Sequence, residues 1–172
     1  MPRTLHQKLS AFNALLLRGC LWGAMFCLVI MTVITLMQVG ARYLFSAPFS
    51  WPEEVARILM VWMTFLAMPY AYREGLLVRL ESMTARMSER LHSRLEIFVH
   101  ALLLLMFMLL LKESIWMVQR GSVIRATSVD VSMGWVFSVM PLSFLLLISV
   151  AVEFLTAALS RDNTDAPAGD IS

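Results

Sequence analysis

The sequence predicts an all-α membrane protein with four membrane-spanning helices and further amphipathic helices at the membrane interface. Its 172 residues are 59% hydrophobic and 15% charged, and the mean hydropathy is +0.75. A helix needs about 20 apolar residues to cross the hydrocarbon core of a bilayer. Lipid offers the backbone no hydrogen-bond partner, so each crossing segment is expected to be helical. Long stretches without a charged residue, each bracketed by charge, occur at 19–41, 58–72, 97–111 and 131–152.

One membrane domain, residues 19–159, is expected to hold all four spans. The spans are predicted at about 19–41, 52–73, 95–117 and 132–155. Two of the charge-free stretches are too short to cross the core alone, so their helices must extend beyond them. We expect the second helix to begin near Trp51 and the third to begin near Ser88 and run past Trp116.

The two ends of the chain are predicted to lie outside the spans. In residues 1–18, Leu5, Leu9, Phe12 and Leu16 recur at helical spacing, which is typical of an amphipathic helix on the membrane surface. The first apolar run is too long for a signal peptide and is interpreted as a retained anchor. Residues 160–172 are polar, contain Pro and Gly, and are expected to be a disordered tail.

The distribution of Lys and Arg predicts the orientation. Nine of these residues lie before the first span, between the second and third spans, or in the tail, and five lie on the opposite side. Both termini are therefore expected to be cytoplasmic. The basic residues lie beside the spans and not on a separate face in water, so we expect no nucleic-acid partner.

The connection "RYLFSAPFSWPEEVAR" predicts how the second helix begins. Ser50 with Glu53 three residues later forms a capping-box pattern. Pro52 fits the first turn, where its missing N–H costs little. Glu53 is expected to pair with Arg57 at i,i+4.

The segment 74–94 forms a basic arm between the second and third spans. Apolar residues recur at helical spacing and charges fall mostly on the opposite face, so the arm either lies in the interface plane or continues into the third span. Its candidate lipid-headgroup ligands are Arg79, Arg86, Arg90 and Arg94. Contact with another subunit is the alternative.

The spans contain few groups able to carry chemistry. Cys20 and Cys27 are too far apart along one helix for a disulfide, and His100 is interpreted as a packed or interfacial histidine. Pro141 should kink the fourth span. We expect no cofactor and no metal site. The chain is expected not to be an enzyme but to have an auxiliary role within a larger complex. A small four-helix membrane redox or enzyme subunit is the alternative.

Polar groups in the spans are predicted to join helices. Glu96, Glu113 and Glu153 lie near predicted span ends, and no carboxylate is expected at mid-span, where an independent carrier would need one. The main polar groups within the spans are hydroxyls and one amide, which are expected to hydrogen-bond between helices. They are Thr32, Thr35, Gln38 and Thr64.

The stretch from Val39 to Glu81 resembles the small membrane subunit of TRAP transporters, the DctQ-type or Q subunit. The family pattern of Arg-Tyr-x-Phe, Trp-x-Glu-Glu, an aromatic-rich helix and Arg-x-Gly is matched by Arg42, Tyr43, Phe45, Trp51, Glu53, Glu54, Trp62, Phe65, Arg73 and Gly75. The chain departs from the pattern at Leu77, where the family usually has His, and at Ser143, where it often has Gly. The resemblance covers about residues 15–158.

The resemblance implies a place in a three-part importer. TRAP systems of bacterial and archaeal inner membranes take up organic acids with sodium. A large membrane subunit carries the substrate and sodium sites, and an extracytoplasmic binding protein delivers the substrate. The small subunit is implied to be a scaffold for the large one and to help dock the binding protein.

Nine residues are candidates for subunit contacts or for local structure: Arg42, Tyr43, Trp51, Glu53, Glu54, Arg57, Trp62, Arg73 and Gly75. The charged ones either cap helices and form surface ion pairs, or contact the large subunit or the binding protein. The tryptophans are interpreted as interfacial or packing anchors. Arg73 and Gly75 are expected to end the second helix on the cytoplasmic side.

Overall fold

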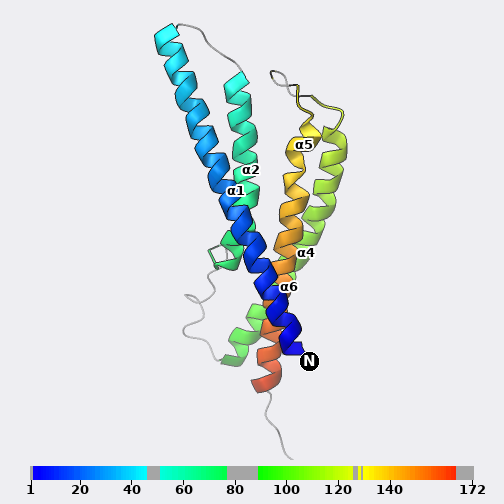
Figure 1. Cartoon of the computed structure of the whole chain (residues 1–172). Coiled ribbons are helices and arrows are strands. Elements are labelled where there is room, and N and C mark those ends of the chain that lie inside the picture. Colours follow the sequence, from blue (N-terminus) through cyan, green and yellow to red (C-terminus); the bar gives the residue numbers. More distant parts are fainter. Residues whose placement is uncertain (1, 46–50, 77–88, 126–127, 129, 166–172) are drawn as a thin grey trace, which may run out of the picture.

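The computed structural model describes residues 2–45, 51–76, 89–125, 128 and 130–165, and these form a bundle of α-helices (Figure 1). Four helical segments are long and apolar enough to cross a membrane, as the sequence predicts. They are Asn13–Tyr43, Trp51–Arg73, Ile97–Gly121 and Met133–Ala158. The described residues are thus all-α, apart from an isolated antiparallel bridge between Arg125 and Ser132.

The first hairpin pairs α1 (Pro2–Phe45) with α2 (Trp51–Arg73). Helix α1 is continuous from Pro2, so no turn separates the segment 1–18 from the first span. The surface location of that segment stays a prediction. Most large apolar side chains of α1 point outward, including Trp22 and Phe26, because α1 packs mainly on one neighbour.

The second hairpin pairs α4 (Glu89–Gly121) with α6 (Val139–Asp165). Helix α4 begins and ends as expected, near Ser88 and beyond Trp116. Its buried seam repeats every seven residues, at His100, Phe107, Ser114 and Gly121, which keeps one stripe against the bundle. His100 is buried against the rings of Tyr72 and Phe154, in agreement with its interpretation as a packed histidine.

The fourth span is interrupted before Pro141. A short helix, α5 (Met133–Phe137), ends at Ser138, and α6 begins at Val139. Proline has no N–H for the carbonyl four residues earlier, and its ring crowds that carbonyl. That carbonyl belongs to Phe137, where the helix breaks. At this break the Ser138 hydroxyl donates to the Trp135 carbonyl oxygen at 2.6 Å.

The two hairpins meet closely at one end of the bundle and diverge at the other (Figure 1). We call the first the Glu153 end; it holds Asn13, Arg73 and Glu153. The other is the Glu54 end, where α1 ends, α2 begins and the 122–132 connection lies. The hydrophobic core lies toward the Glu153 end and consists of Leu17, Tyr72, Phe107, Phe144, Leu147, Val150 and Ala151.

Helix α6 continues to Asp165, which is six residues into the segment expected to be a disordered tail. Adding residues to an existing helix costs little compared with nucleating one, so polar residues can extend it. The rest of that segment, and the capping-box residue Ser50, lie outside the described residues.

Candidate functional site

The residues that the sequence singles out lie at both ends of the bundle and between them. Arg42 and Tyr43 end α1, and both are exposed, Tyr43 to 80%. Trp51 begins α2 at the same end and is also exposed. These three side chains are therefore accessible to a partner at the Glu54 end.

Glu53 and Arg57 form the predicted ion pair on the surface of α2. The Glu53 Oε1 and Arg57 Nη2 atoms are 3.2 Å apart, and both side chains are 71% exposed. A pair this exposed contributes less than about 1 kcal/mol to stability, because water and salt screen it. Its charges remain accessible from outside the bundle.

Glu54 does something the sequence did not predict: it joins the two hairpins. Its Oε2 accepts a hydrogen bond from the backbone N–H of Ser128 at 2.6 Å. Ser128 belongs to the connection between α4 and α5, which is itself closed by an Arg125–Asp130 ion pair and by the Met133 N–H donating to the Ile124 carbonyl. A carboxylate bonded to a backbone N–H makes a stronger bond than a neutral acceptor does.

Two glycines allow α4 and α5 to approach closely below this connection. A Cβ on Gly134 would lie 2.8 Å from Ser122 N and 2.9 Å from the Val118 carbonyl oxygen. A Cβ on Gly121 would lie 2.8 Å from the Phe137 ring. A side chain at Gly134 would collide with backbone atoms, which cannot move aside, whereas the nearest atom at Gly121 belongs to a side chain that can shift.

Trp62 links the middle of the two hairpins. Its ring stacks on that of Trp135, with centroids 4.8 Å apart and planes inclined by 24°. The Trp62 Nε1–H is buried and has no hydrogen-bond partner among the described residues. Trp62 therefore packs between the two hairpins of the chain.

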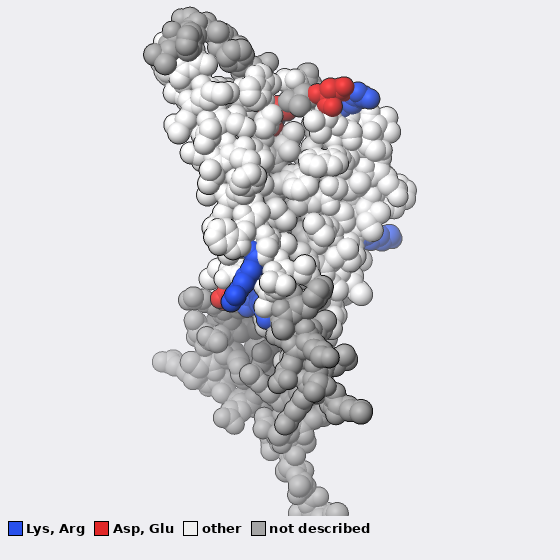
Figure 2. All heavy atoms as spheres, in the orientation of Figure 1, with Lys and Arg blue, Asp and Glu red and all other residues white. Residues whose placement is uncertain are grey.

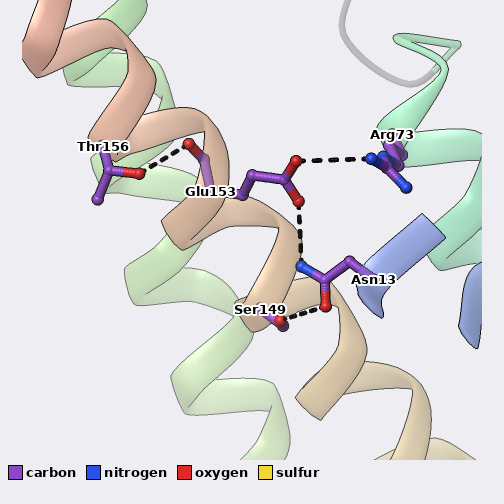
Figure 3. Close-up of polar contacts among 5 residues, drawn as sticks. All are labelled: Asn13, Arg73, Ser149, Glu153 and Thr156. Atoms are coloured by element: carbon purple, nitrogen blue, oxygen red, sulfur yellow. Dashed lines mark hydrogen bonds and ion pairs between the residues drawn. The ribbon is translucent and has the colours of Figure 1, made fainter. Parts of the chain in front are cut away.

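At the Glu153 end, polar side chains from three helices converge on one carboxylate (Figure 3). The Asn13 Nδ2 of α1 donates to Glu153 Oε2 at 3.0 Å, and the Ser149 hydroxyl donates to Asn13 Oδ1 at 2.9 Å. The Arg73 guanidinium of α2 lies 3.5 Å from Glu153 Oε1. Asn13, Arg73, Ser149 and Glu153 form what we call the polar clamp.

The polar clamp is largely removed from water. The Glu153 side chain is 9% exposed and that of Arg73 is 22% exposed, while Asn13 is 3% exposed. Burying a carboxylate is costly, and the ion pair and hydrogen bonds offset that cost only while all partners stay in place. The clamp therefore fixes α1 and α2 against α6 at one depth.

Helix α2 ends at Arg73, as predicted, and Gly75 provides the left-handed residue that closes it. Gly75 has φ +69°. The Leu76 N–H donates to the Ala71 carbonyl at 3.0 Å and the Gly75 N–H to the Tyr72 carbonyl at 3.1 Å. These are the two bonds of a Schellman motif. Arg73 thus serves both as the last helical residue and as a member of the polar clamp.

A second polar contact joins α2 to α6 at a buried proline. Pro69 lies inside α2 and cannot donate to the Phe65 carbonyl. The Ser143 hydroxyl of α6 donates to that carbonyl at 2.6 Å. Ser143 is the residue found where the family often has Gly, and here it supplies the bond that Pro69 removes.

The hydroxyls expected to join helices bond within their own helices. Thr32, Thr35 and Thr64 are exposed, and each donates at 2.8 Å to the carbonyl four residues before it. That expectation was wrong for these three because threonine can reach its own i−4 carbonyl. Cys20 and Cys27 are free thiols.

The candidate headgroup ligands are not tested by the described residues. Arg79 and Arg86 lie outside them. Arg90 and Arg94 lie in the first turns of α4, so this part of the arm is continuous with the third span, but their side chains are not among those described. Lipid binding by all four stays a prediction.

Sequence reasoning missed most of the polar clamp. Asn13 was assigned to a surface helix, and Glu153 was interpreted as a charge near a span end. A usable signal is present, since Ser149 and Glu153 place two polar groups four residues apart on one face of an otherwise apolar helix. Such groups in a span are expected to face a partner and not lipid.

The fold and the clamp define a four-span membrane protein whose buried polar groups join its own helices. A family model describing tripartite ATP-independent periplasmic transporters, DctQ component, matches residues 31–161. The chain belongs to this family, and so to the components of a TRAP transporter. No curated protein matches the chain.

Proposed function

We propose that this chain is the non-catalytic scaffold subunit of a sodium-coupled TRAP importer for an organic acid. It stands beside the large transport subunit, which carries the substrate, and helps to dock the extracytoplasmic binding protein. The polar clamp is the observation that carries the scaffold role. Its buried groups fix α1, α2 and α6 to one another, as a rigid support requires.

The proposed orientation assigns a role to each end of the bundle. The excess of Lys and Arg favours cytoplasmic termini in the inner membrane. The Glu153 end is then cytoplasmic, and the Glu54 end faces the binding protein. The exposed charges of Glu53, Arg57, Arg125 and Asp130 at that end suit a transient, salt-sensitive contact with a soluble partner.

Co-purification and uptake test the proposal together. The tagged chain, extracted in mild detergent, should bring down a larger polytopic protein encoded beside it. Deleting the chain should abolish uptake in cells, and returning it on a plasmid should restore uptake. Reporter fusions at both termini should give cytoplasmic signals.

Two outcomes would defeat the proposal. Transport of solute into liposomes by the purified chain alone would make it an independent carrier. Uptake in the deletion strain equal to that of the parent would leave no essential supporting role. A coloured or thiol-reactive purified chain would favour the redox alternative.

A further inference from the structure

Contacts between helices fix the depth of α4 relative to the two ends of the bundle. The Phe107 ring lies edge-on to Tyr72 with centroids 5.5 Å apart, so Phe107 is level with the Glu153 end. Farther along α4, Gly121 meets Gly134. The residue that follows Gly134 stacks on Trp62, so this second level lies in the middle of α2.

Lys112 and Glu113 lie between these two levels. Lys112 follows Phe107 by five residues and precedes Gly121 by nine, so it lies about 8 Å from the first level and 13 Å from the second, at about 1.5 Å per residue. Both side chains are exposed, and neither forms an ion pair or hydrogen bond with another described residue. The sequence placed Glu113 near a span end, but α4 runs to Gly121.

These two charges fall inside the membrane core when the bundle is aligned with it. Glu54 lies 18 residues from Tyr72 along α2, which is about 27 Å. This distance is close to the thickness of the hydrocarbon core, about 30 Å, so the core is expected to cover the bundle from one end to the other. Figure 2 shows mostly uncharged surface between these ends, with one basic patch at its right-hand edge and a basic side chain slightly lower on its left-hand side.

Moving the bundle along the membrane normal does not remove charged side chains from the membrane core. If one core boundary were at Lys112 with the core extending toward the Glu54 end, the exposed Glu53–Arg57 pair would enter the core. If the core extended the other way, it would take in the charged beginning of α4. Every placement leaves exposed charges in lipid. With the core between the two ends, these include Arg18, Lys112, Glu113 and Arg120.

Lipid is a poor cover for this flank of α4. A charged residue at the centre of a spanning helix costs about 2.5–3.5 kcal/mol on insertion scales. Lys112 and Glu113 lie about 8–9 Å inside the core boundary, where the cost is smaller but still unfavourable. Lys112 can extend its long side chain toward an interface, but the short side chain of Glu113 cannot. Charges in spans almost always face protein or a water-filled cavity.

A groove runs along the same flank and ends against α5. Its volume is about 770 Å³, and its lining includes Lys112, Glu113, Trp116, Met117, Arg120 and Phe137. The Arg120 guanidinium lies over the Trp116 ring, 5.1 Å from its centroid. The flank thus offers an apolar floor bordered by two basic groups and one acidic group.

We propose that this flank of α4 is the surface that binds the large membrane subunit. The proposal rests on the function proposed above and specifies the face that carries it. The matching helix would present an acidic side chain to Lys112 and a basic or hydrogen-bond-donating side chain to Glu113. A two-fold dimer would pair Lys112 with Glu113 of the second copy. The large subunit is the occupant we propose, because the family is a component of a tripartite transporter with a second membrane subunit.

Replacing both charges with leucine separates a subunit contact from a lipid-facing surface. If α4 faces the large subunit, K112L/E113L should lower its recovery in co-purification by about tenfold, equivalent to about 1.4 kcal/mol. If the flank faces lipid, removing two charges should leave recovery unchanged or raise it. T32L/T35L is the matched control, because it removes two exposed polar groups on α1 that are already bonded within their own helix.

Photo-crosslinking identifies the occupant directly. A benzophenone amino acid at Trp116 or Met117 in the intact transporter should give an adduct with the large subunit, whereas one at Phe26 or Val29 on α1 should not. Adducts with a second copy of this chain, or with lipid only, would overturn the proposal. Strong co-purification with no adduct from α4 would contradict the proposed binding surface but not the proposed scaffold function. Failure to co-purify would contradict the scaffold function itself.

Discussion

The two ends of the bundle use charged residues in opposite ways. At the Glu153 end, Arg73 and Glu153 are drawn inward and bind across helices. At the Glu54 end, Glu53 and Arg57 pair on one helix and stay exposed. Helices that meet closely can bury a polar group with its partners. At the diverging end Glu54 reaches the other hairpin through a backbone N–H of the connection between α4 and α5. One family motif therefore contains residues that hold the chain together and residues accessible to a partner.

The largest expected effect comes from removing the carboxylate of the polar clamp. E153L leaves the Arg73 guanidinium and the Asn13 amide without their shared partner, and breaking a buried pair in this way costs about 3 kcal/mol. E153Q keeps an acceptor for Asn13 and should cost less. Denaturant titration of the purified chain in detergent micelles would measure both.

T156V is the matched control for the clamp. Thr156 is exposed and its hydroxyl donates to the Glu153 carbonyl, not to the carboxylate. Its replacement should cost less than about 1 kcal/mol. A stability for E153L equal to that of T156V would show that the clamp contributes nothing to the bundle.

The next largest effect is expected where α4 and α5 touch through glycine. G134A places a methyl group 2.8–2.9 Å from three backbone atoms, and such overpacking costs about 1–3 kcal/mol. G121A should cost less, since its nearest neighbour is the Phe137 side chain, although Gly134 backbone atoms lie 3.0–3.2 Å away. Thermal unfolding in detergent would rank the variants.

G40A is the control for the glycine contact. A Cβ at Gly40 meets nothing within 4 Å. Alanine there should be neutral or stabilise α1 by up to about 1 kcal/mol, because alanine is the better helix former. If G134A behaved like G40A, the close approach of α4 and α5 would not be a constraint on the sequence.

The helices could be predicted from the sequence, but the contacts between them could not. Charge-free stretches bounded by charge locate the spans, and Gly75 marks the end of α2, because these signals are local. The polar clamp joins Asn13 to Glu153 across 140 residues of chain. Such pairing depends on the relative depth of three helices, which no local pattern specifies.

The same limit explains why the sequence did not predict the contacts of Pro69 and Thr32 or the depth of Lys112. A proline in a span frees a carbonyl, but only packing shows that Ser143 reaches it. A threonine hydroxyl can bond within its own helix or to a neighbouring helix, and that of Thr32 bonds within its own helix. Lys112 ends a charge-free stretch, yet α4 continues beyond it. The sequence showed which groups were polar, but not their depth.

A smaller effect is expected at the bond between Ser143 and the Phe65 carbonyl. S143A leaves that carbonyl without its interhelical donor and should cost about 1 kcal/mol. P69A restores an N–H that can reach the same carbonyl, so S143A should cost less in that background. A double-mutant cycle measured by denaturant titration gives the coupling. Equal costs in both backgrounds would mean that Ser143 does not compensate for Pro69.

The smallest effect on stability is expected at the exposed pair of the Glu54 end, and that makes it informative about partners. E53Q breaks a pair whose side chains are 71% exposed, so the free energy of unfolding should change by less than about 0.5 kcal/mol. R73Q, at the other end, should lower stability measurably because it leaves Glu153 buried without its cation. If uptake falls in E53Q while stability holds, the loss reports a contact outside the chain. If uptake also stays at the parental level, Glu53 has only a local role, and the contrast between the two ends is one of burial alone.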